Sequence, residues 1–332
     1  MKKNGFKILE LKDVRDDLLK YREQGALRGV YLGFPTFHEH YTMSLPGCTD
    51  WTGFPASGKS EFLIEMLLNT SLFHGWKHLL YVPDVGDKNE IISLIIHKIT
   101  GKTFDKRYTS NLITEAEVDK ELDWTLHHFR ILTQVDLKSK ITPYEFWDMA
   151  AAMNDSVIGG IQTATIDSWK DMKHGVGPTG ETFARDDKYL EDVLSYRNAM
   201  SEHHKMHFHI IGHPNKTDKD TSGKRIPPTP YDMKGGGEWF NNGKTQITLH
   251  RVDGTFNQVR VIVNKAKPKS VAKLGEVTFC LDITKNSYYI EGVESNEYRS
   301  EINEKPRALL LAEKESSIFD DDNDGYDNDL PF

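Results

Sequence analysis

Cysteine is scarce in this chain of 332 residues, which contains only Cys48 and Cys280. Two cysteines cannot form a disulfide framework, and their scarcity fits a reducing cytoplasm as the expected compartment. The sequence also lacks any run approaching the roughly 18 apolar residues of a membrane-spanning helix. Its first residues, MKKNGFKILELKD, show no apolar stretch before small residues, so we expect no signal peptide and no membrane contact.

Positive charge is not in excess either, because the net charge is −8. A chain of this charge, taken as a whole, does not suggest a nucleic-acid partner. The charge is uneven, however, since residues 318–332 contain six aspartates and no lysine or arginine. The rest of the chain is therefore nearly neutral and can still carry a local basic groove.

Composition and periodicity divide the chain into three parts. Residues 1–28 contain a short amphipathic helix that is expected to stop at Gly25. The alternating strand and helix patterns of residues 29–292 predict one α/β domain. Residues 293–332 are charged and rich in Asn and Asp, so we expect a tail that is largely disordered.

Strands and helices alternate through the first part of the middle region. The expected strands are 78–83, 129–134, 161–167 and 207–212. The expected helices are 60–73, 87–100, 143–154 and 185–205. After residue 245 the sequence predicts only strands, in the segments TQITLH, QVRVIVN, EVTFCLDI and SYYIEG. This order indicates an α/β fold in which a mostly parallel sheet is closed by antiparallel C-terminal strands.

A phosphate-binding motif is present at residues 53–60, where GFPASGKS matches G-x4-G-K-S. In such a loop the backbone N–H groups surround a phosphate, Lys59 reaches the β- and γ-phosphates, and the Ser60 hydroxyl binds Mg²⁺. The candidate nucleotide-binding residues are Gly53, Pro55, Ala56, Ser57, Gly58, Lys59 and Ser60. ATP and Mg²⁺ are the expected cofactors. The alternative is a chance Gly/Ser-rich turn, and Asp50 weakens the strand expected before the loop.

Two aspartates follow strands that the fold places near this loop. Asp167, at the end of IQTATID, stands where a P-loop protein needs a second carboxylate for Mg²⁺. Asp84, after the strand that follows the P-loop helix, is a candidate base for activating water. Each aspartate can also be interpreted as a structural residue that caps the start of the next helix.

The ordered motifs of the middle region resemble the helicase domain of DnaB-type ring helicases. They are TGFPASGKSEFL, HGWKHLLYVPD, ITGKTF, ATIDSWKDMKH, IIGHPNK, PPTPYDMKGGGEWF and KLGEVTF. The pattern is most similar to the branch of Twinkle and the phage primase–helicases. This resemblance implies a RecA-like core, a hexameric ring around single-stranded DNA, ATP at the subunit interfaces, and a phage gene expressed in the host cytoplasm.

The resemblance also assigns roles by matching position. His213, in IIGHPNK, would sense the γ-phosphate, and Asp84 stands where the family usually has glutamate. Lys265 and Lys267 stand in the element from which the family usually supplies an arginine finger to the neighbouring subunit. Lysine brings the charge but not the two-pronged guanidinium, so the hydrolysis rate is open and a recombinase remains an alternative.

The resemblance places basic residues of two loops toward single-stranded DNA. The first loop contains Lys216, Lys219, Lys224 and Arg225, and the second contains Lys234 beside three glycines. Contacts of this kind follow the phosphate backbone and carry no base specificity. Without the resemblance, these loops would be interpreted as solvated surface.

The C-terminus, DDDNDGYDNDLPF, resembles the tip of bacterial single-stranded DNA-binding proteins. Asp329, Leu330, Pro331 and Phe332 would dock this tip on a replication partner, with the aspartates steering it toward a basic pocket. A solubilising tail, or a tail that covers the basic loops, is an equal alternative.

Three functional hypotheses follow. The first is an ATP-driven ring helicase that moves 5′ to 3′ on single-stranded DNA in replication. The second is a RecA-like recombination ATPase, which the lysine pair favours. The third is a nucleotide-binding replication adaptor that acts through its acidic tail.

Overall fold

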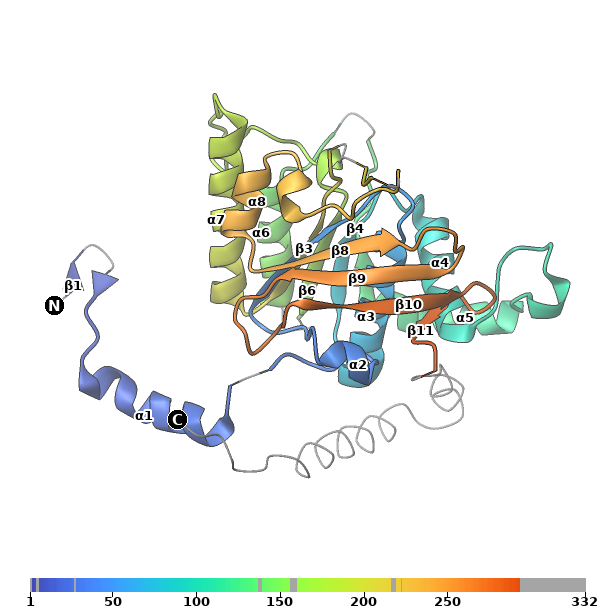
Figure 1. The fold of residues 1–332 in the computed structure, drawn as a ribbon, viewed down its shortest axis with the longest axis horizontal. Helices are drawn as coiled ribbons and strands as arrows, with labels where there is room; N and C mark the ends of the chain where they lie inside the picture. Colours follow the sequence, from blue (N-terminus) through green and yellow to red (C-terminus); the bar gives the residue numbers. More distant parts are fainter. Residues whose placement is uncertain are drawn as a thin grey trace.

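The computed structural model describes residues 2–3, 6–26, 28–136, 139–155, 160–215, 219–221 and 223–292 (Figure 1). A nine-stranded sheet forms the centre, in the order β11-β10-β9-β8-β3-β7-β6-β4-β5. Its strands are β3 (Gly47–Thr52), β4 (His78–Tyr81), β5 (Phe129–Ile131), β6 (Thr163–Asp167), β7 (His207–Ile211), β8 (Thr245–Arg251), β9 (Gln258–Lys265), β10 (Gly275–Asp282) and β11 (Ser287–Tyr289). A two-stranded hairpin, β1 (Lys2–Lys3) and β2 (Phe6–Lys7), precedes the first helix.

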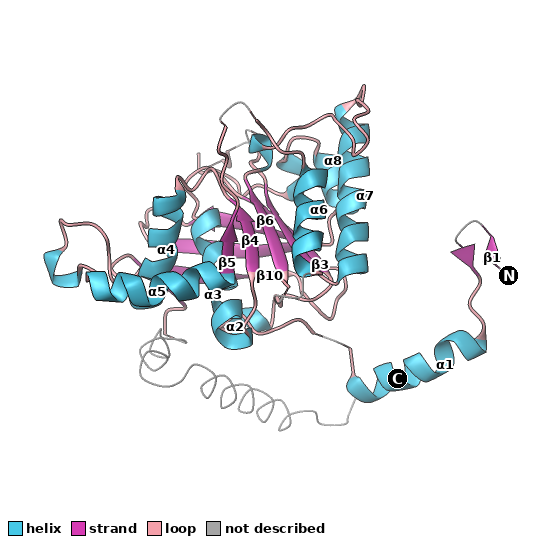
Figure 2. Ribbon diagram, turned by 180° about the vertical axis from the view of Figure 1, so that it is seen from behind, coloured by secondary structure: helices cyan, strands magenta, loops and turns pink. Residues whose placement is uncertain are grey.

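Helices cover both faces of the sheet, which gives three layers (Figure 2). The α-helices are α1 (Leu11–Gln24), α2 (Pro35–His38), α3 (Lys59–His74), α4 (Lys88–Thr100), α5 (Glu115–His128), α6 (Pro143–Asn154), α7 (Asp186–His204) and α8 (Gly236–Asn242). Alternation along a strand sends Leu80 to the apolar cluster beneath α3 and Leu79 to the cluster beneath α6 and α7. None of the described helices is both long and apolar enough to span a membrane.

The predicted fold class is confirmed, with one correction to strand direction. Strands β3 to β8 pair in parallel, and β9, β10 and β11 continue the sheet in antiparallel pairs. The segment TQITLH was expected in the antiparallel run. It forms β8, which is parallel to β3 and antiparallel to β9, because the connection from β7 through α8 returns the chain in the same direction.

Asp50 does not weaken the strand in which it lies. All six residues of β3 are buried, and this strand occupies the middle of the sheet. The carboxylate of Asp50 accepts a hydrogen bond from the buried guanidinium of Arg197, which α7 supplies from above the sheet. A buried charge is tolerated when a hydrogen-bonded partner compensates it, and here the partner lies far away in the sequence.

Most predicted elements agree with the structure to within a few residues. The helix predicted at 143–154 is α6 at the same bounds, while the strand predicted at 129–134 is only the three residues of β5. Helix α5 was not predicted. It begins with a reciprocal capping box between Thr114 and Glu117, but only two of its side chains, Glu121 and Thr125, are buried. A helix with so little buried apolar surface gives a weak periodic signal.

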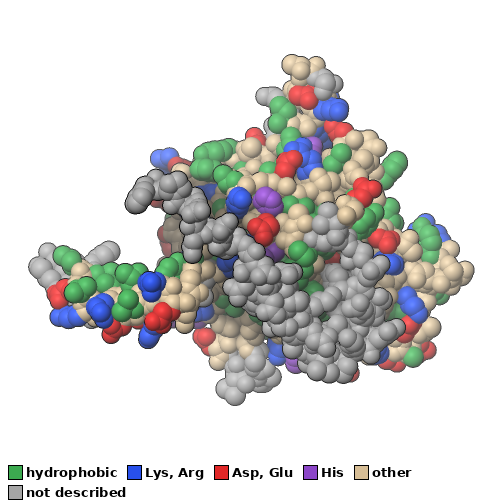
Figure 3. Space-filling model, turned by 60° about the horizontal axis from the view of Figure 1, so that its bottom comes forward, with side chains coloured by type: hydrophobic (Ala, Val, Ile, Leu, Met, Phe, Trp, Pro, Cys, Tyr) green, Lys and Arg blue, Asp and Glu red, His purple; other side chains and the backbone are tan. Residues whose placement is uncertain are grey.

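The N-terminal helix α1 stands away from the sheet, as Figure 1 shows. It ends at Gln24, and Gly25 takes a left-handed conformation (φ +72°), so the predicted stop is confirmed. Apolar side chains lie along one side of this arm and charged ones along the other (Figure 3). Leu11 and Leu18 are 75% and 64% exposed. The helix therefore presents an apolar face that its own domain does not cover.

Candidate functional site

The phosphate-binding loop connects the end of β3 to the start of α3. Gly53 has φ +151°, and a Cβ there would lie 2.3 Å from the carbonyl oxygen of Leu249. Gly58, with φ +87°, is the residue at which α3 begins. Both glycines are therefore required by the loop's shape, and the first turn of α3 directs its free N–H groups toward the space that a phosphate would fill.

Lys59 folds back onto the loop. Its Nζ donates hydrogen bonds to the carbonyl oxygens of Gly53 and Phe54, each at 2.9 Å. Burial lowers the pKa of Lys59 to about 8, although the nearby carboxylates of Asp167 and Asp84 oppose that shift. The ammonium thus lies in the loop with only weak neutral acceptors, and a phosphate would be a stronger partner.

Asp167 ends β6 and faces Ser60 across the site. Burial raises the pKa of Asp167 to about 6, while a hydrogen bond from Ser60 acts in the opposite direction. Among the described residues, no group makes a hydrogen bond to the buried Oδ2 atom of Asp167. A serine hydroxyl and a carboxylate with an unused oxygen are hard donors of the kind that Mg²⁺ takes, so these two residues fit the expected ion.

Asp84 follows β4 and lies beside Asp167, to whose carbonyl oxygen its backbone N–H donates at 3.4 Å. One carboxylate oxygen of Asp84 accepts a hydrogen bond from Nε2 of His213 at 3.1 Å. The other oxygen lies 2.9 Å from Nζ of Lys170. Burial would raise the pKa of Asp84, but hydrogen bonds from Lys170, His213 and Ser168 outweigh it, and the pKa is lowered.

The structure thus brings five predicted residues together at the carboxyl edge of the sheet and adds a sixth. We call this set the edge cluster. It consists of Lys59, Ser60, Asp84, Asp167, Lys170 and His213. Lys170 lies in the motif ATIDSWKDMKH but had no predicted role, because its contact with Asp84 joins residues from different loops.

Arg225 was predicted to contact DNA, but it lies at the phosphate loop. Its guanidinium is 5.2 Å from the centroid of the Phe54 ring. Both residues line a pocket of about 280 Å³ together with Pro55, Ala56, Ser57 and residues 250–255 of the β8–β9 hairpin. Arg225 therefore lies against the phosphate loop, and its predicted contact with DNA stays a prediction.

Comparisons with known proteins agree with this geometry, although no family model matches the chain. The Twinkle homolog protein, chloroplastic/mitochondrial, of Arabidopsis thaliana is 26% identical over 290 residues, which cover 85% of this chain and 39% of the relative. The chain is therefore similar to part of a Twinkle homolog. It spans about two fifths of the length of that relative, so the resemblance concerns one part of a larger protein.

Two solved structures share the fold of this chain. One is an ATPase domain with a TM-score of 0.67 at 13% identity, covering 85% of this chain and 98% of that domain. The other, a DnaB-like replicative helicase described together with its interactions with primase, has a TM-score of 0.67 at 14% identity, with coverage of 84% and 68%. At these identities the two structures establish the fold alone.

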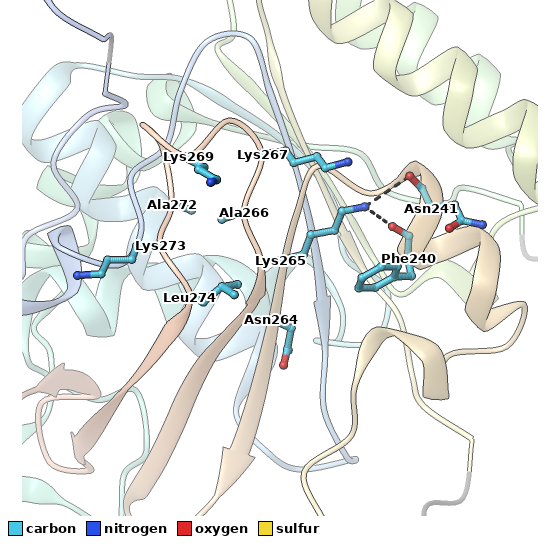
Figure 4. Close-up of a pocket in the computed structure, with 10 residues that line it drawn as sticks. All are labelled: Phe240, Asn241, Asn264, Lys265, Ala266, Lys267, Lys269, Ala272, Lys273 and Leu274. Atoms are coloured by element: carbon cyan, nitrogen blue, oxygen red, sulfur yellow. Dashed lines mark hydrogen bonds between the residues drawn. The ribbon is translucent and has the colours of Figure 1, made fainter. Parts of the chain in front are cut away.

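Lys265 and Lys267 lie away from the phosphate loop of their own domain. Lys265 ends β9 opposite Gln246, and its Nζ donates to the carbonyl oxygens of Phe240 and Asn241 (Figure 4). Lys267 lies beyond it, on the side of the amino ends of β3 and β8, in the wall of a pocket of about 670 Å³. The phosphate loop follows the carboxyl end of β3, so neither lysine serves its own nucleotide site.

The remaining predicted DNA contacts are only partly described. Lys219 and Arg225 form an antiparallel bridge across their loop, and Lys224 is exposed in it. Lys234 lies 3.4 Å from Asp186, with both side chains exposed. Lys216 and the tail residues lie outside the described residues, and their roles stay predictions. The tail residues are Asp329, Leu330, Pro331 and Phe332.

Proposed function

We propose that this chain is the ATP-hydrolysing motor domain of a DnaB-like DNA helicase. One observation carries the proposal. Lys59 and Ser60 of the phosphate loop face Asp167, whose buried Oδ2 has no hydrogen-bond partner among the described residues. An unpartnered buried carboxylate costs stability, and a bound cation would remove that cost. The arrangement suits a magnesium–nucleotide site better than a structural turn.

The residues of the edge cluster have separable tasks in this proposal. Lys59 exchanges the carbonyl oxygens of Gly53 and Phe54 for phosphate oxygens of ATP. Ser60 and Asp167 would hold Mg²⁺. When bound, the ion neutralises charge that develops on the phosphates during their transfer to water.

Asp84 and His213 would act on the far side of the γ-phosphate. Asp84 is the carboxylate that would orient and deprotonate the attacking water. His213 is bonded to Asp84 through Nε2, and its buried Nδ1 has no partner among the described residues. Because β7 places His213 at the start of the loop that leads to Lys219 and Lys234, it links the hydrolysis site to the predicted DNA contacts.

Self-association into a ring is part of the same proposal. The exposed apolar face of α1 would be buried against a neighbouring subunit, and the amino-end position of Lys267 suits action on a neighbour's nucleotide. Movement from 5′ to 3′, a closed hexamer, a primase or tail-binding partner, and a phage source follow from the relatives by analogy.

Unwinding of a forked DNA duplex with a 5′ single-stranded tail, in the presence of ATP and Mg²⁺, tests the proposal. The native chain should separate the strands, and Lys59→Ala should not. Lys120→Ala, an exposed lysine on α5, is the matched control and should behave as the native chain. A fork with only a 3′ tail tests the direction of movement.

Failure of the native chain would separate the alternatives. If it binds single-stranded DNA as a filament without unwinding, the recombinase hypothesis replaces the helicase. If it binds nucleotide but neither hydrolyses it nor assembles, the adaptor hypothesis replaces both. The assembly state is read by size-exclusion chromatography with light scattering and by electron microscopy.

A further inference from the structure

Each oxygen of the Asp84 carboxylate already has one partner in this structure. Oδ1 lies 2.9 Å from Nζ of Lys170, and Oδ2 accepts the hydrogen bond of His213 at 3.1 Å. A carboxylate that is to take a proton from water needs an unshared electron pair directed at that water, and an ion pair on the same oxygen makes it a weaker base. The pair with Lys170 therefore restrains one of the two oxygens from which Asp84 can act.

Lys170 is held less firmly than the rest of the edge cluster. It belongs to a single 3₁₀ turn, η2 (Trp169–Asp171), directly after β6, and its side chain is 58% exposed. Among the contacts described for its ammonium group, Asp84 supplies the only ion pair. An ion pair at this exposure is weak enough for another anion to displace.

The surroundings of Lys170 are open to a phosphate chain. Lys170 lines a pocket of about 400 Å³ with Trp169, His213 and Lys234. The pocket lies between the segments that follow β6 and β7, so it joins the hydrolysis site to the loop that carries Lys234. Lys234 is itself exposed and paired only weakly, at 3.4 Å, with Asp186. Two lysines beside aromatic rings suit a sugar–phosphate backbone with unstacked bases.

We propose that Lys170 is a positioning residue that restrains Asp84 until a phosphate of single-stranded DNA draws its ammonium away. Release frees one oxygen of Asp84 for water, so ATP hydrolysis becomes dependent on DNA. The inference rests on the proposed helicase function and adds its regulation. The group that replaces Asp84 beside the Lys170 ammonium is a phosphate oxyanion. We assign it to the DNA backbone, and the γ-phosphate of ATP is the alternative source.

The test compares ATP hydrolysis with and without oligo(dT) in four full-length proteins: the native chain, Lys170→Met, Lys170→Arg and Lys173→Met. Lys173 is an exposed lysine in the same loop, so it controls for loss of charge. Lys170→Met should raise the DNA-independent kcat by roughly two- to fivefold, the range that an exposed ion pair supports. Its stimulation by DNA should fall by the same factor, with the KM for ATP unchanged.

A binding measurement gives a second readout that does not depend on hydrolysis. Fluorescence anisotropy of labelled oligo(dT) with ADP should show weaker binding and a smaller salt dependence for Lys170→Met, because one phosphate contact is lost. Lys170→Arg keeps the charge and should retain both the restraint and the affinity. Lys173→Met should match the native chain in kcat and in its stimulation by DNA.

Several outcomes would overturn the inference. A kcat that falls both with and without DNA would make Lys170 a promoter of hydrolysis. An equal rise in both conditions would show that DNA does not release the restraint. If the native chain is stimulated by DNA and Lys170→Met responds like Lys173→Met, this inference alone is wrong. If the native chain hydrolyses no ATP, the proposed function itself is wrong, and the inference fails with it.

Discussion

Two sets of buried polar groups in this protein differ in how their charges are compensated. Inside the sheet, Asp50 forms an ion pair with Arg197, although Asp50 Oδ2 and Arg197 Nε make no hydrogen bond among the described residues. His207 and His78 each use both ring nitrogens in hydrogen bonds. At the carboxyl edge, Asp167 forms no ion pair among the described residues and keeps an unpaired oxygen, and Lys59 is bonded only to carbonyl oxygens. We call the first set, Asp50, Arg197, His78 and His207, the interior pairs.

The difference separates groups that stabilise the fold from groups that are available to a ligand. The interior pairs have partners supplied by distant parts of the chain, so their removal leaves an uncompensated polar atom. The edge cluster stores unused hydrogen-bonding capacity, which a phosphate and a cation would satisfy. Changes in the two sets should therefore have opposite consequences for activity and for stability.

The largest expected effect is on activity. Asp167→Asn should lower kcat for ATP hydrolysis by roughly 100-fold or more, because a carboxylate assigned to Mg²⁺ is replaced by a weaker neutral ligand and the charge stabilisation that the ion would supply is lost. Stability should stay the same or rise, since a buried carboxylate with a raised pKa is replaced by a neutral amide. Steady-state kinetics and thermal unfolding of the same protein check both halves. A large loss of stability would show that Asp167 belongs with the interior pairs.

The interior pair of Asp50 and Arg197 should give the reverse result. Arg197→Met leaves the Asp50 carboxylate buried without a partner, which should lower the free energy of unfolding by roughly 3–5 kcal/mol. The double change Asp50→Leu with Arg197→Met should recover most of that loss. Urea unfolding measures the three proteins. Equal destabilisation of the single and double variants would contradict the pairing argument.

Acid should destabilise the interior pairs. Burial lowers the pKa of His78 to about 3 and that of His207 to about 4, so both are neutral in the folded chain. In the unfolded chain they take up protons near pH 6.5, so stability falls as the pH drops below that value, by roughly 1–2 kcal/mol for each histidine at pH 5.

Unfolding measured between pH 7 and pH 5 tests this pH dependence. His207→Gln removes one titrating group while an amide can still serve Ser44 and Thr49. The slope of the free energy of unfolding against pH should therefore be smaller in this variant than in the native chain. An unchanged slope would mean that His207 does not contribute to the pH dependence of the free energy of unfolding as expected.

The smallest expected effect concerns Arg225 at the rim of the edge cluster. Its contact with the Phe54 ring is worth about 0.5–1 kcal/mol at a partly exposed site, so Arg225→Ala should raise the KM for ATP roughly two- to fivefold. Arg225→Lys should have a smaller effect. If only DNA affinity changes, with KM unaltered, Arg225 belongs with the DNA loop, as its sequence position predicted.

The sequence predicted what depends on local patterns. The phosphate loop is recognisable because the glycines at 53 and 58 and the pair Lys59-Ser60 must stand at fixed spacing for the backbone to surround a phosphate. Helix α6 was predicted at its observed bounds, and its start carries local signals, since Thr142 and Glu145 form a capping box around Pro143. Asp84 and Asp167 were found because one stands shortly after a buried strand and the other ends a buried strand.

Only the tertiary structure decided which distant residues meet. Arg197 lies 147 residues from Asp50, and no local pattern in either segment announces the pair. Lys170 had no predicted role and Arg225 was predicted only to contact DNA, yet one lies against Asp84 and the other over Phe54. Local spacing fixes which elements form and which backbone atoms can hold a phosphate. Whether a charge is compensated, restrained or left free depends on where the packed sheet and helices bring its partner.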